Sequence, residues 1–330
     1  MMNANLSRLL AGRSIGVLYG GFSNEREISL LSGEAVAAAL SGAGHPVRRI
    51  DVDKSFGHEG LDALGGVGLV FIVLHGEFGE DGQVQEILER WGIPYTGSGP
   101  QASRLAMDKV AAKKIFVREG VSTPRWEVSP RKAKPKELVA RLGLPLVVKP
   151  SASGSSIGVT IVQKVGDLPA ALAEAGRHQG VPLVEEFIAG RELTVGILGD
   201  AALPAIELRP KARFYDYRAK YADDAGTEYL CPAPVSPEET AAAQALALAA
   251  HRALGCRDFS RVDLRLSPAG KLFVLEVNTI PGFTGHSLLP KAAAQVGISF
   301  AALAERIAEM ALADESRNPA AKGGKVTHGG

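Results

Sequence analysis

Arg261-Val-Asp-Leu-Arg-Leu-Ser-Pro-Ala-Gly-Lys-Leu-Phe-Val-Leu-Glu-Val-Asn278 holds two runs of alternating residues around a Ser-Pro-Ala-Gly turn. Turn formers between two such runs predict a β-hairpin. We pair residue 266 with 271, 264 with 273, 263 with 274 and 261 with 276. Because cross-strand partners point the same way, this register predicts an apolar face of Val262, Leu264, Phe273, Leu275 and Val277 and an opposite face of Arg261, Asp263, Glu276 and Asn278.

The polar face of this hairpin fits a metal site. Two carboxylates (Asp263, Glu276) and the amide oxygen of Asn278 are ligands that Mg²⁺ accepts while phosphates complete its coordination. A solvated surface with an Arg261–Glu276 ion pair fits the same pattern equally well. The strand ends at Asn278 and is followed by Thr-Ile-Pro-Gly282, which favours the mouth of a site over an ordinary surface.

A second candidate segment is Ser151-Ala-Ser-Gly-Ser-Ser156, which lies between predicted strands at 145–149 and 157–162. Small residues expose many backbone N–H groups, which suit a loop that covers phosphates, and Lys149 adds a cation. The segment is not a Walker A loop, because no Gly-Lys-Ser/Thr occurs and a strand follows. An ordinary flexible turn remains the alternative for this loop taken alone.

The first hundred residues alternate strands and helices. Apolar runs at 14–19, 45–52 and 69–74 predict strands, and helical spacing predicts a helix over 25–43. This alternation indicates a parallel sheet, whose ligand sites lie at the carboxyl ends of the strands. Those ends are residues 20–25, which include Glu25, and residues 75–82, which begin with His75. A structural role for His75 stays open.

The remainder predicts helices over 107–119 and 237–254 and strands at 183–187 and 193–198. Ser236 and Glu239 form a capping box at the start of the second helix, on which we expect His251 to be a surface residue. We expect domains at 1–97, 98–188 and 189–314, with a disordered polar tail at 315–330.

Composition excludes several classes of function. The chain has 330 residues, a formal net charge of +1 and two cysteines. No charge excess attracts nucleic acid, no apolar run crosses a bilayer, and no signal peptide or disulfide framework is visible. We therefore expect a cytoplasmic protein without nucleic-acid or membrane partners.

Several motifs in order resemble one family. They are Gly20-Gly-Phe-Ser-Asn-Glu-Arg-Glu-Ile-Ser29, Leu74-His-Gly-Glu-Phe-Gly-Glu-Asp-Gly82, Met107-Asp-Lys109, Gly154-Ser-Ser-Ile-Gly158, Phe214-Tyr-Asp-Tyr-Arg-Ala-Lys-Tyr221 and Pro281-Gly-Phe-Thr-Gly-His-Ser-Leu-Leu289, together with the hairpin. The sequence is similar to the ATP-grasp superfamily and, within it, to the D-alanine–D-alanine ligases, over about residues 15–312. The resemblance implies an α/β fold that is α+β in its central and C-terminal parts, with three domains of which the first carries the parallel sheet.

The resemblance also implies an ATP site. Lys109 and Lys149 would bind phosphates under a loop with Ser155 and Ser156. The adenine hinge would be Glu185, Glu186, Phe187 and Ile188, with Glu192 at the ribose and Phe214 on the base. Asp263, Glu276 and Asn278 would hold two Mg²⁺ ions, for which Mn²⁺ is an acceptable substitute, and Glu276 would bridge them.

For the substrates, the resemblance implies two molecules of D-alanine. Glu25 would bind the ammonium group of the first, with His75 nearby and with Ser155 and Tyr221 linked to Glu25. Lys220, Ser287 and the Leu288 amide would bind the carboxylate of the second. Arg261 and the Gly282 amide would stabilise the oxyanion, and residues 213–228 would form a lid. A homodimer is implied as well.

Three other functions fit parts of the sequence. A D-alanine–D-lactate or D-alanine–D-serine ligase would share this architecture, but Tyr221 after Lys220 resembles the dipeptide-forming enzymes. A non-catalytic nucleotide-binding protein is a different class. A dinucleotide-dependent dehydrogenase is disfavoured, since Gly20-Gly21 lacks the G-x-G-x-x-G spacing.

Overall fold

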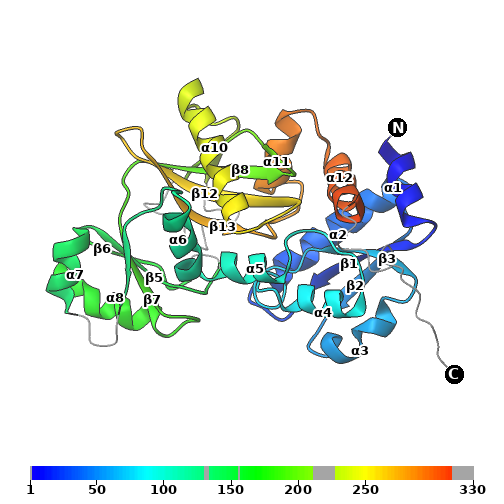
Figure 1. Cartoon of the computed structure of the whole chain (residues 1–330), viewed down its shortest axis with the longest axis horizontal. Helices are drawn as coiled ribbons and strands as arrows, with labels where there is room; N and C mark the ends of the chain where they lie inside the picture. The colour runs from blue at the N-terminus through cyan, green and yellow to red at the C-terminus, as the bar shows by residue number, and fades with distance from the viewer. Residues whose placement is uncertain (1, 130–133, 155–156, 211–226, 314–330) are drawn as a thin grey trace.

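The computed structural model describes residues 2–129, 134–154, 157–210 and 227–313. Within these ranges three β-sheets follow one another along the chain, with helices packed against them (Figure 1). Each sheet falls inside one of the predicted ranges 1–97, 98–188 and 189–314, although the boundaries themselves stay a prediction. None of the helices in the described ranges is both long and apolar enough to span a membrane.

The first sheet is parallel, with strand order β2-β1-β3, as the alternation of strands and helices predicts. Gly20 and Gly21 end its central strand with φ of +83° and +77°, a region that glycine adopts at little cost. The helix predicted over 25–43 is α2. The elements are β1 (Ser14–Gly20), β2 (Val47–Val52), β3 (Val67–Ile72), α1 (Met2–Leu10), α2 (Arg26–Gly42), α3 (Phe56–Ala63) and α4 (Gln83–Trp91).

The last helix of the described chain, α12 (Phe300–Ala313), packs against α1, α2 and β3 of the N-terminal part as well as against its neighbour in sequence, α11 (Leu288–Gln295). Leu303 and Ile307 lie in one core with Val17 and Phe71, and Figure 1 shows α12 beside α1 and α2. The N-terminal core is thus completed by residues from the far end of the chain.

The central sheet is antiparallel, with order β4-β7-β5-β6. Helices cover one face of it, because Leu138, Leu142 and Leu168 share a core with Val148. Its elements are β4 (Trp126–Val128), β5 (Leu146–Pro150), β6 (Thr160–Val162), β7 (Pro182–Glu186), α7 (Pro135–Leu142), the 3₁₀ helix η1 (Val165–Asp167) and α8 (Leu168–Ala175).

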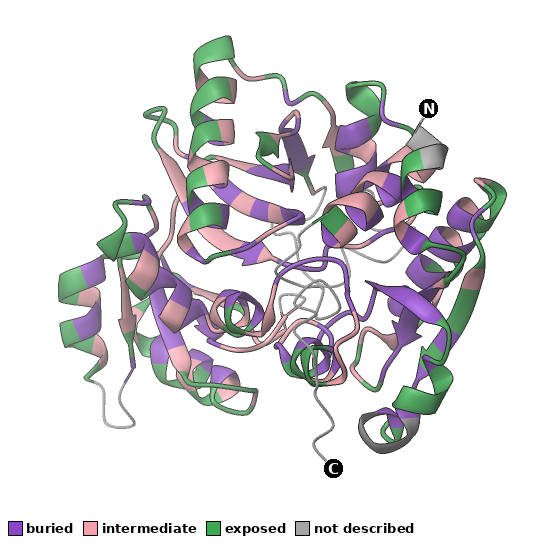
Figure 2. Ribbon diagram, turned by 45° about the vertical axis from the view of Figure 1, so that its right-hand side comes forward, coloured by how far each residue is buried: buried purple, intermediate pink, exposed green. Residues whose placement is uncertain are grey.

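The third sheet has order β11-β10-β8-β12-β13, with β9 paired to β8. Ala102 and Phe116, from the helices that precede the central sheet, lie in its core. Buried residues run along its strands and along the inner faces of its helices (Figure 2). The elements are α5 (Pro100–Met107), α6 (Lys109–Arg118), β8 (Arg191–Leu198), β9 (Ala201–Ala202), β10 (Ile206–Arg209), β11 (Glu228–Leu230), α10 (Pro237–Ala253), β12 (Phe259–Leu266), β13 (Leu272–Asn278) and α11 (Leu288–Gln295).

The capping box of α10 is confirmed. The Ser236 hydroxyl accepts from the Glu239 N–H, and the Glu239 carboxylate accepts from the Ser236 N–H. The prediction that His251 is a surface residue is wrong. Its side chain lies 2.7 Å from the Ser260 hydroxyl (Nδ1 to Oγ) and is buried against β12, and this burial lowers its pKa to about 4.

The predicted hairpin is β12–β13, but its register differs from the predicted one. Arg261 pairs with Asn278 and Asp263 with Glu276, whereas Leu264 pairs with Val274. Leu275 is therefore an extra residue in β13, a β-bulge. The bulge places Val274 in the core and leaves Phe273 and Leu275 half-buried, so the prediction that these two share the apolar face with Val277 is wrong.

Candidate active site

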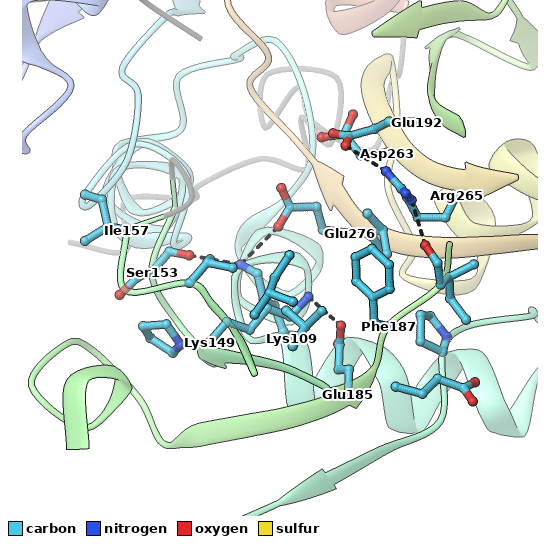
Figure 3. A pocket seen from close by; sticks show the side chains of 18 residues that line it. Lys109, Lys149, Ser153, Ile157, Glu185, Phe187, Glu192, Asp263, Arg265 and Glu276 are labelled. Carbon is cyan, nitrogen blue, oxygen red and sulfur yellow. Dashed lines mark hydrogen bonds and ion pairs between the residues drawn. The ribbon is translucent and has the colours of Figure 1, made fainter. Parts of the chain in front are cut away.

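A pocket between the central sheet and the β12–β13 hairpin collects most residues predicted to bind ATP (Figure 3). The third sheet and the central sheet each contribute one wall. Its lining includes Lys109, Lys149, Glu185, Glu186, Phe187, Ile188 and Glu192, together with Asp263 and Glu276. Residues predicted from distant motifs thus meet at one place.

The two predicted phosphate-binding lysines enter this pocket from different elements. Asp108 caps α6 by accepting from the N–H groups of Val110 and Ala111, which sets Lys109 in the first helical turn. The Lys109 ammonium donates to Ser153 O at 2.9 Å and lies 3.1 Å from Glu276 Oε2. Lys149, on β5, lies 2.9 Å from Glu185 Oε2, and Figure 3 shows the two lysines turned to these different partners.

The predicted adenine hinge forms the far wall. The Glu186 carboxylate accepts from the backbone N–H and the Nε of Arg125, so this side chain is already engaged by the protein. Arg265, which the sequence analysis left unassigned, donates to Ile188 O at 3.1 Å and to Glu192 Oε2 at 3.2 Å, and it stacks over Phe187. Its alternation with Arg261 and Asp263 along β12 is the signal that could have identified it.

The predicted metal ligands lie together at the open end of the hairpin. Asp263 and Glu276 are direct cross-strand partners, and Asn278 Nδ2 donates to Asp263 Oδ2 at 3.1 Å. Arg261 binds Asp263 through two N–H···O contacts of 2.9 Å, and Thr194 donates to it at 2.6 Å.

This donor set fits a hard divalent cation. Carboxylate and amide oxygens of Asp263, Glu276 and Asn278 share one edge. The described residues contain no group of three histidine, cysteine or acidic side chains that could hold a metal by themselves. A metal here would therefore need the amide of Asn278 and oxygens from a ligand, as a nucleotide phosphate supplies.

A second pocket opens beside the first and shares Glu276 with it. It lies where the N-terminal sheet meets the end of β13 and the start of α11. All the described residues that were predicted to hold D-alanine or its reaction intermediate line it, namely Glu25, His75, Arg261, Gly282, Ser287 and Leu288.

Glu25, immediately before α2, lies close to two backbone segments. A β-carbon on Gly76 would be 3.0 Å from Glu25 Oε2, and one on Gly154 would be 3.6 Å from the same oxygen. The Glu25 carboxylate therefore lies close both to Gly76, in the segment that follows β3, and to Gly154, in the loop predicted to cover the phosphates. Glycine at position 76, with φ of +76°, permits this close approach.

His75 uses both ring nitrogens on protein groups. Nδ1 is 3.0 Å from Ile280 O, and Nε2 is 3.0 Å from the hydroxyl of Ser32 on α2. The same hydroxyl accepts from the N–H of Phe283 at 3.3 Å. Two side chains of the N-terminal part thus hold the loop on both sides of Gly282, so a structural task for His75 accompanies any contact with substrate.

The other wall is the start of α11. Ser287 precedes the helix and its hydroxyl accepts from the Thr284 N–H at 2.9 Å, while Leu288 is the first helical residue. Unpaired N–H groups at a helix start favour anions. A β-carbon on Gly282 would come within 3.1 Å of Ser287 Oγ, so a larger residue there would crowd this hydroxyl.

Glu80 is a site residue that the sequence analysis missed. It lines the second pocket, and its Oε1 lies 3.7 Å from His75 Nδ1. Burial raises the pKa of Glu80; the contact with His75 opposes this rise, and the carboxylate of Glu25 adds to it. Its place in the segment that ends β3, beside His75, was the available signal.

Five predicted site residues lie outside the described residues, together with most of the predicted lid at 213–228. They are Ser155, Ser156, Phe214, Lys220 and Tyr221. Their predicted roles stay predictions.

Comparisons with known proteins identify the family of this chain. Family models described as the N-terminus and C-terminus of D-ala D-ala ligase match residues 53–98 and 116–309. A D-alanine–D-alanine ligase of Syntrophotalea carbinolica is 48% identical over 299 residues, which cover 90% of this chain and 96% of the relative.

Two solved structures extend the likeness to three dimensions. The D-alanine–D-alanine ligase of Bacillus anthracis complexed with ATP has a TM-score of 0.80 at 32% identity, covering 93% of this chain and 99% of that one. The VanG D-Ala:D-Ser ligase of Enterococcus faecalis has a TM-score of 0.79 at 32% identity, covering 91% and 99%. By its sequence over nine-tenths of its length, the chain belongs to the D-alanine–D-alanine ligase family.

Proposed function

We propose that this protein joins two molecules of D-alanine at the expense of ATP, and that the dipeptide serves the synthesis of peptidoglycan precursors. One observation carries the proposal: the pocket that contains Lys109 and Lys149, which we call the nucleotide pocket, meets the pocket lined by Glu25 and Arg261 at a shared residue, Glu276. A phosphoryl donor and a carboxylate substrate can then face each other at that point. The family's ligase activity and the ATP bound by a relative support the same assignment.

The first step activates a carboxylate. A carboxylate is a poor electrophile, so the γ-phosphoryl group of ATP passes to the carboxylate of the first D-alanine and gives an acyl phosphate and ADP. Lys109 and Lys149 would hold the phosphates, and Glu25 would hold the ammonium group of this D-alanine. Asp263, Glu276 and Asn278 would hold two Mg²⁺ ions, which neutralise charge on the phosphoryl group when bound.

The second step forms the amide. The amine of the second D-alanine attacks the acyl carbon, and the tetrahedral intermediate releases inorganic phosphate. Its oxyanion would accept from Arg261 and from the Gly282 N–H; one such donor typically contributes about 2.7–4 kcal/mol to transition-state stabilisation. The carboxylate of the attacking D-alanine would lie at Ser287 and the start of α11.

The test is phosphate release with D-alanine, D-lactate or D-serine as the second substrate. We expect ATP turnover that depends on D-alanine and yields the dipeptide. Preferential use of D-lactate or D-serine at neutral pH would show instead a D-alanine–D-lactate or D-alanine–D-serine ligase. No turnover with any of the three second substrates would favour a non-catalytic nucleotide-binding protein.

The Glu276→Gln variant tests the shared residue itself. It keeps the size of the side chain and removes the charge, so we expect turnover to fall below detection while the circular dichroism spectrum stays unchanged. Turnover near the wild-type rate would refute the metal assignment.

The resemblance further implies a homodimer in the cytoplasm, which we include in the proposal. Light scattering of the purified protein and fractionation of cells that express it would test these two points independently of activity.

A further inference from the structure

Behind the nucleotide pocket, one buried carboxylate lies between two lysines. Glu185 Oε2 is 2.9 Å from the ammonium group of Lys149, and Glu185 Oε1 is 2.9 Å from that of Lys113. The side chains of Glu185 and Lys113 are 2% and 1% exposed. With all three groups ionised, the cluster carries one surplus positive charge in a region where little water screens it.

Lys113 stands apart from the pocket that the other two line. Lys149 and Glu185 belong to the pocket wall, whereas Lys113 reaches Glu185 from α6 and does not line the pocket. The Lys113 ammonium also donates to the Thr123 hydroxyl at 2.6 Å, and that hydroxyl donates to Val274 O at 2.8 Å. Lys113 therefore lines neither of the two pockets. Any effect of Lys113 on the nucleotide pocket passes through Glu185 and Lys149.

The geometry points to Lys113 as a positioning residue for nucleotide binding: by occupying one oxygen of Glu185, it leaves Lys149 with a charge to present to the phosphates of ATP. The inference rests on the proposed function, since it assumes that this pocket takes a nucleotide. Without Lys113, Lys149 and Glu185 would form an ion pair with no net charge. The attraction of this pocket wall for the phosphates of a nucleotide would then weaken.

A purely structural role would not explain why a charged side chain is buried here, because burial of a charge costs desolvation free energy. Burial lowers the pKa of Lys113 to about 8, although Glu185 and Glu186 on β7 oppose the shift, while Lys149 on β5 adds to it. Burial likewise acts to raise the pKa of Glu185, but Lys149 and Lys113 outweigh it and hold this pKa below its usual range. An apolar side chain of similar length fills such a site without the cost of desolvating a charge.

The charge of Lys113 gives the inference a pH dependence. Lys113 is protonated below about pH 8 and neutral above it, so the surplus charge of the cluster is lost as the pH rises through that value. We expect the affinity for a nucleotide to weaken over the same interval. A residue that only filled space would leave the affinity flat with pH.

The experiment measures the dissociation constant of MgADP by calorimetry between about pH 7 and pH 9, without D-alanine. Lys113→Met removes the charge and should weaken binding roughly 10-fold at pH 7 and abolish the pH dependence. Lys113→Arg keeps the charge throughout and should bind nearly as wild type, without weakening at high pH. Lys114→Met, the matched control on the exposed side of the same helix, should leave the affinity unchanged.

Three results would overturn the inference: Lys113→Met binding MgADP like wild type at pH 7, Lys113→Arg binding as weakly as Lys113→Met while folded, or a wild-type affinity that is flat with pH. The last measurement needs no variant, so it decides the matter even if a substitution prevents folding. If wild type binds MgADP and forms dipeptide, and Lys113→Met binds MgADP with the same affinity, only this inference is refuted. If wild type binds no MgADP, the proposed function is refuted.

Discussion

The hydroxyl of Ser32 offers a test of how helix α2 positions the predicted reaction centre. It accepts from the Phe283 N–H at 3.3 Å and contacts His75 Nε2 at 3.0 Å, and it is fully buried. Replacing Ser32 by Ala leaves the Phe283 N–H and one ring nitrogen without this partner. Such a loss costs about 1–3 kcal/mol of folding free energy.

The effect on catalysis should exceed what this loss of stability explains. Gly282 directly precedes Phe283, and its N–H is a predicted oxyanion donor. Complete loss of one donor typically lowers kcat about 10²–10³-fold, so a displaced rather than absent donor should lower kcat roughly 10-fold. The KM for ATP should stay near wild type, because the nucleotide pocket lies on the other side of Glu276.

Ser29 provides the matched control. It lies one turn earlier on α2, is equally buried, accepts from the Gly20 N–H at 2.9 Å and donates to Val73 O at 2.6 Å. Ser29→Ala should therefore lose similar stability without touching the loop at Gly282. The assays are thermal unfolding and steady-state phosphate release at temperatures where both variants are folded. If Ser32→Ala and Ser29→Ala both keep kcat within about twofold of wild type, the Ser32 contact does not position the donor.

Two further predictions concern stability. The pKa of His251 is about 4 in the folded protein and about 6.5 in the unfolded chain, so the unfolded chain binds a proton first as the pH falls. Roughly 3 kcal/mol of folding free energy, present above pH 6.5, should therefore be lost by about pH 4. In urea unfolding across this range, His251→Gln should show a shallower dependence of stability on pH than wild type. Ser236→Ala breaks the capping box of α10 and should cost about 1 kcal/mol in the same assay, whereas an unchanged midpoint would mean that the cap contributes nothing.

Local chemistry explains why much of the fold could be predicted. The parallel strands, α2 and the capped helix α10 each follow from signals within about 20 residues: apolar runs, helical spacing of apolar residues and a Ser-x-x-Glu cap. The described residues that the resemblance assigned to the site line two adjoining pockets in the structure. Their individual roles are predictions that the experiments above address.

Contacts between distant residues could not be predicted in the same way. Lys113 meets Glu185 across 72 positions, and Ser32 meets Phe283 across 251. No periodicity within α6 or α2 distinguishes these side chains from ordinary core or surface positions. His251 shows the same limit, since a histidine on an alanine-rich helix gives no sign of which face β12 will cover.

The bulge in β13 shows why a departure from regular pairing belongs at this site. In an unbroken strand, residues 275 and 276 would point to opposite faces, so the hairpin could offer the pocket either an apolar wall or a carboxylate there. With the extra residue, both Leu275 and Glu276 line the nucleotide pocket, while Val274 and Val277 on either side remain in the core.

The loop before β4 holds this irregular edge of β13, because Ser122 O accepts from the Val274 N–H and Thr123 donates to Val274 O. The same Thr123 hydroxyl accepts from Lys113, so the edge that sets Glu276 and the cation that acts on Lys149 are held by one short segment. Substitutions in this segment should therefore affect the binding of nucleotide and the placement of Glu276, the predicted metal ligand, together.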